Sequence, residues 1–290
     1  MPRPPVVAIS SHVARGSVGN RAMAFALERL GHEVWSVPTV LLAHHPGRGP
    51  GPRTAIARDT FAAMLDALGA ADRFPAVGGL VSGYFADAGQ VEAVARLVSA
   101  LKEASPGALF VCDPVIGDSG RLYVDDSVAA AVRDRLLPLA DVATPNAFEC
   151  AWLAGEPGRT GDAATLAALL PCPNVVVTSV PALMRGHIGN LLSTEGDAVL
   201  AEHRAVETAV KGTGDLLAAL LLARLLEGRG IVKALEMAAA SVFEVVAATA
   251  RAGGDEMMLA EFQTALVQPR APVAIRRFAP RPSLKPRPLV

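Results

Sequence analysis

The sequence predicts an α/β protein in which a central, mostly parallel sheet lies between two layers of helices. Short runs of β-branched residues alternate with longer segments rich in Ala and Leu, which is the pattern of parallel strands joined by helices. Of the 290 residues 51% are hydrophobic, enough for a large core. No change of composition divides the chain, so we expect one domain over residues 1–267.

The expected elements follow one another in this alternating order. Strands are expected at residues 6–10, 33–37, 76–82, 109–113, 141–144 and 175–178, where β-branched runs occur. Helices are expected at residues 18–30, 55–68, 88–104, 124–136, 147–154, 165–170, 215–226 and 231–252. Residues 188–203 alternate poorly between apolar and polar, and they predict a pair of edge strands.

Two segments differ from this pattern. Residues 43–54 are too rich in Gly and Pro for regular structure and too polar for the core. They predict either a lid beside an active site or a solvated connector. Residues 268–290 contain many Pro and Arg residues and little apolar periodicity, which predicts a poorly ordered tail.

Charge and cysteine content restrict the function classes. Lys plus Arg number 27 and Asp plus Glu 28, and the net charge of −1 gives no reason to expect nucleic acid or a membrane as partner. Three cysteines without close spacing indicate neither disulfides nor a zinc site, and favour a reducing compartment. The first apolar run, residues 6–9, is too short for a signal peptide or membrane span, so we expect a cytoplasmic protein.

The strongest functional signal is Lys211-Gly212-Thr213-Gly214-Asp215, followed directly by a strongly apolar helix. Glycines let the backbone approach an anion, and the unpaired N–H groups at a helix start attract phosphate. A carboxylate beside phosphates is repelled unless it binds a metal or moves a proton, so Asp215 suits a general base. The alternative is a glycine turn with Asp215 as helix cap, and the motif alone leaves both open.

Further acids follow two of the expected strands. Asp113 and Asp118 come after the strand at residues 109–113, where they suit either a metal site or a turn. Asn146 and Glu149 follow the next strand at a spacing of three. That spacing places both side chains on one side of a helical first turn, where they suit a cation site or, more simply, a capping box.

Together with the 212–215 motif, several segments resemble the pyridoxal/pyridoxine (vitamin B6) kinase family of the ribokinase-like superfamily. They are residues 11–20, 81–84, 111–118 with 123–124, and 144–149. The resemblance implies a ribokinase-like three-layer α/β/α fold with a central, mostly parallel sheet. It also implies ATP-dependent phosphorylation of the 5′-hydroxymethyl group of pyridoxal, pyridoxine or pyridoxamine, with pyridoxal 5′-phosphate formed from the aldehyde.

The resemblance also implies roles for individual residues. Asp215 would be the base, and Gly212, Thr213 and Gly214 would form the anion hole. The residues implied to bind the vitamin are Ser11, Val18, Val40, Leu42, His45 and Tyr84. The residues implied to bind ATP are Asp113, Asp118, Thr144, Asn146, Glu149, Thr178 and Ser179. Lys211 is added to them because of its position at the start of the 212–215 motif. Asp113 and Glu149 would organise Mg²⁺ directly or through water, and a monovalent cation such as K⁺ is a further implied ligand.

Some residues depart from the family pattern. Arg48, Arg53, glycines and prolines occupy the loop at residues 43–54, where the family often has aromatic residues. Pro46 replaces a hydroxyl residue of some members, and Ser10 a common glutamine. Two alternatives therefore stay open: a hydroxymethylpyrimidine kinase, and a non-catalytic module that binds vitamin B6 or a nucleotide. Because family members are commonly homodimers, the resemblance also implies a homodimer.

Overall fold

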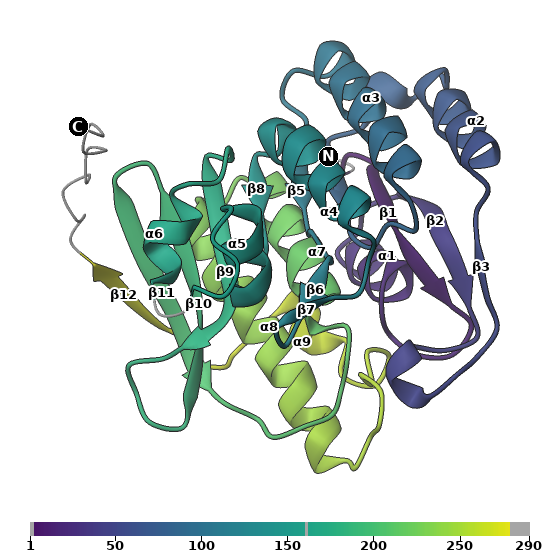
Figure 1. Ribbon diagram of the computed structural model, residues 1–290. Helices are drawn as coiled ribbons and strands as arrows, with labels where there is room; N and C mark the ends of the chain where they lie inside the picture. Colours follow the sequence, from purple (N-terminus) through teal and green to yellow (C-terminus); the bar gives the residue numbers. More distant parts are fainter. Residues whose placement is uncertain (1–2, 160–161, 279–290) are drawn as a thin grey trace, which may run out of the picture.

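The computed structural model describes residues 3–159 and 162–278, and within them a ten-stranded sheet passes between two layers of helices (Figure 1). In spatial order its strands are β12 (Ala274–Phe278), β11 (Asp197–Arg204), β10 (His187–Thr194), β9 (Asn174–Pro181), β8 (Val142–Ala143), β5 (Leu109–Cys112), β4 (Gly79–Ser82), β1 (Val6–Val13), β2 (Val34–Leu42) and β3 (Arg53–Ala55). Within the run from β9 to β2, each strand pairs parallel with the next. The strands at both ends, β3 and β10 to β12, pair antiparallel.

The helices divide between the two faces of the sheet. One face is covered by α2 (Arg58–Gly69), α3 (Ala88–Ala104), α4 (Asp126–Ala131), α5 (Ala147–Leu153) and α6 (Ala163–Ala167). The other face is covered by α1 (Asn20–Arg29), α7 (Thr213–Leu226), α8 (Ile231–Arg251) and α9 (Thr264–Val267). A short hairpin of β6 (Gly117–Asp118) and β7 (Arg121–Leu122) lies outside the main sheet.

Strand β1 connects the two layers because it is buried on both faces. Val7 and Ile9 belong to the apolar cluster under α2 and α3, whereas Val6 and Ala8 belong to the cluster under α1 and α7. This alternation is the period of two that a strand imposes on its side chains. Helix α7 is buried on all sides between residues 216 and 224, as a helix without a polar face must be.

The predicted strands and helices are present, with shifted ends. Strand β8 is only two residues long, and α2 begins three residues later than expected because residues 53–55 pair with β2 as β3. Residues 188–203 do form a pair, β10 and β11, but β11 is not an edge strand because β12 lies beyond it.

The prediction of a poorly ordered tail over residues 268–290 is wrong for residues 274–278. These form β12, which pairs with β11 and satisfies its outer backbone groups. Arg276 also forms an ion pair with the buried Glu202, so a charged strand has a charged partner. Residues 279–290 lie outside the described part of the chain.

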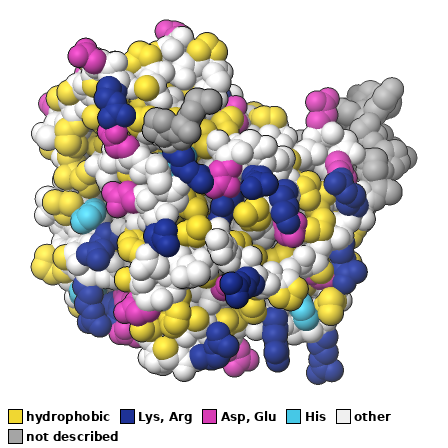
Figure 2. Space-filling view, turned by 180° about the vertical axis from the view of Figure 1, so that it is seen from behind, with side chains coloured by type: hydrophobic (Ala, Val, Ile, Leu, Met, Phe, Trp, Pro, Cys, Tyr) yellow, Lys and Arg dark blue, Asp and Glu magenta, His cyan; other side chains and the backbone are white. Residues whose placement is uncertain are grey.

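The surface carries both charge signs. Figure 2 shows the face turned away in Figure 1, on which basic and acidic side chains lie interspersed. Among the described residues, no helix is long and apolar enough to cross a membrane. Cys112, Cys150 and Cys172 are all free thiols.

Candidate active site

The 212–215 motif forms the first turn of α7, at the carboxyl-end edge of the parallel strands. Gly212 has a left-handed backbone, with φ of 86°, and a Cβ there would lie 2.4 Å from the carbonyl oxygen of Ser17. Only glycine fits such a turn without a shift of its neighbours. Gly212, the N-cap residue of α7, has no side chain to cap the helix, and the N–H groups of a helical first turn are suited to an anion.

Asp215 lies beside the turn between β1 and α1. The Gly19 backbone donates a hydrogen bond to its carboxylate, and burial raises the pKa of Asp215 to about 6. Gly19 in turn packs against Ser11: a Cβ on Gly19 would lie 2.2 Å from the Ser11 carbonyl oxygen and 2.5 Å from its Oγ. The candidate base and the Ser11 side of the site thus share one tightly packed glycine.

Asp113 approaches the same turn from the opposite side. A Cβ on Gly214 would lie 3.6 Å from Asp113 Oδ2, and Thr144 Oγ1 donates to Asp113 Oδ1 at 3.0 Å. Burial, together with the charges of Glu149 and Asp215, raises the pKa of Asp113 well above its usual value. A buried carboxylate near two others favours a cation at this position.

Glu149 has a bracing role that the sequence left open. Its Oε1 accepts the N–H groups of Ile116 and Gly117 at 2.8 and 3.2 Å, and its Oε2 accepts that of Asn146 at 2.9 Å. Asn146 Oδ1 accepts the Glu149 N–H at 3.0 Å, which completes a capping box. Burial nevertheless raises the pKa of Glu149 to about 7. Direct ligation of a metal would compete with three backbone donors, so the capping interpretation, rather than a metal ligand, is the one this geometry supports.

The loop that Glu149 braces contains a strained residue. Val115 has a φ of 44°, which a β-branched side chain rarely adopts, and Glu149 holds the two N–H groups that follow it. Asn146 Nδ2 also donates to the Gly117 carbonyl at 2.8 Å. Asp118 is exposed and accepts the N–H of Ser119 at 2.6 Å, which is the turn role left open by the sequence.

A cavity of about 210 Å³ opens on the β9 side of the motif. Thr178, Ser179, Thr213 and Gly214, all predicted site residues, lie in its wall. The remaining wall comes from β10, β11, residues 205–210 and α8, and includes Asn190, His203, Val206, Val242 and Phe243. The rings of His203 and Phe243 lie 5.2 Å apart. Such a cavity suits a flat heterocycle at one end and an anion at the α7 end.

On the other side of the motif lie the residues expected to bind the vitamin. Val40 and Val18 are buried, and Ser11, Leu42 and His45 are half-buried at the carboxyl ends of β1 and β2. Lys211 is close enough to His45 to contribute, after burial, to the lowered pKa of that ring. The loop at residues 43–54 therefore reaches the start of the anion-hole turn.

Tyr84 is fixed through its backbone and its ring. Thr39 Oγ1 donates to the Tyr84 carbonyl at 2.7 Å, and Ser10 Oγ accepts the Tyr84 N–H at 3.1 Å. Arg53 Nη2 donates to the Tyr84 hydroxyl at 2.7 Å, and its guanidinium carbon lies 5.9 Å from the ring centroid. Ser10 and Arg53, two of the departures from the family pattern, thus both hold Tyr84 in place.

Comparisons with known proteins bear on the family and the fold. The family model described as phosphomethylpyrimidine kinase matches residues 75–259. A pyridoxal kinase of Rubrobacter xylanophilus is 39% identical over 94% of this chain and 97% of its own length. The pyridoxal kinase of Leishmania donovani, solved with ADP and pyridoxamine, has a TM-score of 0.87 at 30% identity, over 95% of this chain and 99% of that one. The chain belongs to the pyridoxal kinase family. The predicted family, its ribokinase-like fold and the kinase class are thereby confirmed.

Sequence reasoning about this kinase missed most of the cavity wall. His203, Val206 and Phe243 come from β11, the following connection and α8, none of which contains a motif. One signal was available, because residues 205–210 directly precede the Gly-rich motif and must approach the same ligand. Among the described residues, no group of three or more His, Cys, Asp or Glu side chains could hold a metal.

Proposed function

We propose that this kinase transfers the γ-phosphoryl group of ATP to the 5′-hydroxymethyl group of pyridoxal, pyridoxine or pyridoxamine. The observation that carries the proposal is the position of Asp215. Its carboxylate is hydrogen-bonded to Gly19 on the Ser11 side, and it lies in the first turn of α7, which adjoins Asp113 and the cavity. The 5′-hydroxyl of the vitamin and the γ-phosphoryl group of ATP would meet beside Asp215.

In this proposal each side of the site holds one substrate. The nucleotide base occupies the cavity between Val206 and Phe243, and its phosphates face the backbone donors of Gly212, Thr213 and Gly214. The pyridine ring lies near Ser11 and Tyr84. Asp215 accepts the proton of the 5′-hydroxyl as its oxygen attacks the γ-phosphorus, and ADP leaves. With a pKa of about 6, Asp215 is mostly ionised at neutral pH and can accept that proton.

Mg²⁺ fits the donor set present. This ion is usually held by one or two carboxylates together with phosphate oxygens and water, which agrees with a site that lacks three acidic ligands among the described residues. We propose that Asp113 holds it, directly or through water, and that Glu149 braces the loop behind it. When bound, Mg²⁺ neutralises charge on the transferred phosphate. A requirement for K⁺ stays a prediction, to be tested by replacing it with Na⁺.

The rival function is phosphorylation of hydroxymethylpyrimidine, and the matching family model is described as phosphomethylpyrimidine kinase, which is also named after a substituted methylpyrimidine. Both substrates present a hydroxymethyl group on a nitrogen heterocycle, so Asp215 would serve either. The deciding experiment measures ADP release with pyridoxal, pyridoxine, pyridoxamine and hydroxymethylpyrimidine as acceptors. We expect kcat/KM to be highest for a B6 vitamer. A clear preference for the pyrimidine would overturn the proposal.

We also retain the predictions of a homodimer and of a cytoplasmic location. Light scattering after size-exclusion chromatography of the full chain tests the prediction of a homodimer. A mass of one chain across the accessible concentration range would reject it.

A further inference from the structure

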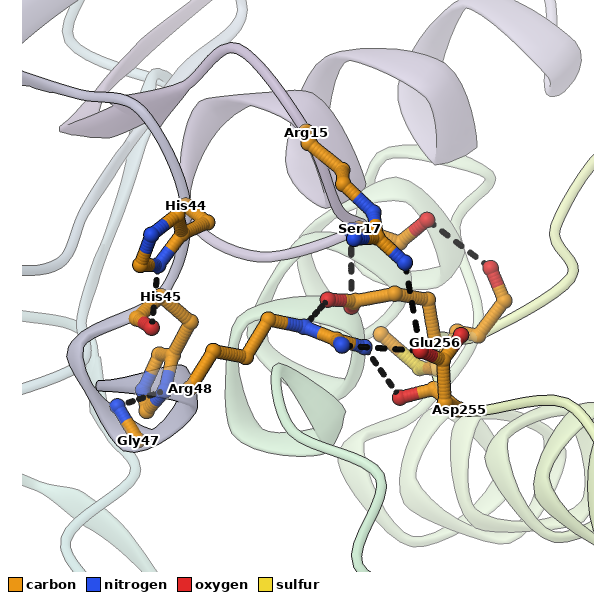
Figure 3. Close-up of polar contacts among 9 residues, drawn as sticks. Arg15, Ser17, His44, His45, Gly47, Arg48, Asp255 and Glu256 are labelled. Carbon is orange, nitrogen blue, oxygen red and sulfur yellow. Dashed lines mark hydrogen bonds and ion pairs between the residues drawn. The ribbon is translucent and has the colours of Figure 1, made fainter. Parts of the chain in front are cut away.

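The loop at residues 43–54, called the lid loop below, is fastened to the segment after α8 by Arg48 (Figure 3). Arg48 Nε donates to Glu256 Oε1, Nη1 donates to Asp255 Oδ2 at 2.8 Å, and Nη2 donates to the Asp255 carbonyl at 2.7 Å. These partners are more than 200 residues away in the sequence. One guanidinium therefore joins two segments that are far apart in the sequence.

Burial does not hold the lid loop in this position. Every one of its residues, from 43 to 54, is either exposed or only half-buried. Its short strand β3 pairs with β2 at one end, and the turn at Pro46 is capped by His45, whose Nδ1 accepts the Gly47 N–H at 3.0 Å. Arg48 makes the loop's charged contacts with the opposite wall of the site.

Glu256 also contacts the turn between β1 and α1. Its Oε2 accepts the Ser17 N–H at 3.3 Å, and Ser17 Oγ donates to the Met257 carbonyl at 2.8 Å. A Cβ on Gly16 would lie 2.9 Å from Glu256 Oε1, so the carboxylate is packed closely against this turn. Its side chain is only 17% exposed, compared with 66% for Asp255.

The same turn supports the reaction centre. A Cβ on Gly212 would lie 2.4 Å from the Ser17 carbonyl oxygen and 3.0 Å from Met257 Cε. Two residues after Ser17, the Gly19 backbone donates to the Asp215 carboxylate. A displacement of Glu256 or Ser17 would therefore move the anion hole and the base.

We infer that Arg48 and Glu256 are positioning residues for phosphoryl transfer, since they fasten the lid loop across the vitamin side and align the anion-hole turn beneath it. The inference rests on the proposed function. Arg48 presents three donors to Glu256 and Asp255, and the side chains of Arg48 and Glu256 are only 24% and 17% exposed. Such a pair is stronger than an open surface pair such as Arg15 with Asp255, in which both side chains are about two-thirds exposed.

The first test is kinetic. For Arg48→Ala we expect the KM for pyridoxal to rise by about 10-fold, because only a fraction of molecules would hold the lid loop closed. The KM for ATP should change by less than about 2-fold, because Arg48→Ala leaves the hydrogen bond between Glu256 and the Ser17 N–H in place, and the polar partners of Arg48 do not line the nucleotide cavity. Arg48→Lys keeps the charge but not the fork of donors, so its KM for pyridoxal should lie between those of the parent and of Arg48→Ala.

Removal of the two charges tests the pairing itself. Glu256→Gln keeps an acceptor for the Ser17 N–H and removes the charge that faces Arg48. Glu256→Gln and Arg48→Ala should each raise the KM for pyridoxal, and the double variant should raise it by less than the product of the two single effects. The matched control is Arg73→Ala, which breaks an exposed pair with Glu33 away from the site and should leave both KM values unchanged. A double variant whose effect equals that product would overturn the inference.

A measurement without catalysis separates this inference from the proposed function. Trypsin can cut after Arg53 in the lid loop, and Arg48→Ala should increase the rate of that cut by about 10-fold in the full chain. Unchanged cleavage together with an unchanged KM for pyridoxal would overturn the positioning role. If the parent protein phosphorylated no B6 vitamer while Arg48→Ala still opened the loop, the proposed function would fail and the fastening role would stand.

Discussion

The two sides of the site are built by different means. The side that we propose binds the nucleotide is a cavity between β9 to β11 and α8, and its wall includes buried core residues such as Leu217 and Ala239. The vitamin side is held by single polar contacts: Ser10 and Thr39 to Tyr84, and Arg48 to Glu256. The first has core residues in its wall, whereas the second is closed by a loop without a buried residue. Nucleotide binding should therefore tolerate change poorly and vitamin binding should be adjustable.

Asp215 lies where the two sides meet, and its loss should have the largest effect. Asp215→Asn keeps the size and the acceptor for the Gly19 N–H but cannot take a proton. We expect turnover to fall by roughly 10²-fold or more, with ATP binding retained. ADP release measures the turnover, and calorimetry measures the binding of ATP. Asp134→Asn, at an exposed ion pair, is the control. Turnover equal to that of the parent would remove the base assignment and favour a binding module.

The pH profile tests the same residue without a substitution. Burial raises the pKa of Asp215 to about 6, and a general base must be ionised to act. Activity should therefore be present above pH 6 and be lost as the pH falls through that value. At pH 5 we expect kcat/KM to be about 10-fold below its plateau. A profile flat from pH 7 to pH 5 would contradict the raised pKa or the role of Asp215.

Glu149 shows why part of this site could not be read from the sequence. The spacing of Asn146 and Glu149 suits a cation site as well as the simpler capping box, and the role of Glu149 in bracing the loop depends on the N–H groups of Ile116 and Gly117, more than 30 residues earlier. By contrast, the apolar runs and the Gly-rich motif were sufficient for the central strands and for the start of α7. Local patterns encode elements, but not the distant partners of a polar side chain.

Strand β12 was missed for a related reason. Two of its five residues, Arg276 and Arg277, are charged, and both pair with acids near or on β11. Its strand conformation depends on a partner more than 70 residues away, which no local propensity reveals. The wall of the cavity is similar, because His203 and Phe243 meet only once β11 and α8 are packed.

The nucleotide side can be tested separately through Phe243. Phe243→Ala removes a ring from the cavity wall, so the KM for ATP should rise by about 5-fold, while the KM for pyridoxal should not change. Steady-state kinetics with each substrate varied in turn provide both values. Thermal unfolding checks that the fold is kept, since Phe243 is only half-buried. A parallel rise in both KM values would mean that the two sides are not independent.

The smallest effect is expected on the vitamin side, for Tyr84→Phe. The change removes the hydroxyl that accepts from Arg53 and keeps the ring, whose backbone contacts to Ser10 and Thr39 are unaffected. Because Arg53 is exposed, this contact is worth little, and we expect the KM for pyridoxal to rise by only about 2-fold. Tyr84→Ala, which also removes the ring, should raise the KM for pyridoxal further. A loss for Tyr84→Phe as large as that for Tyr84→Ala would mean that the hydroxyl itself binds the vitamin, and that this side is less adjustable than its loop suggests.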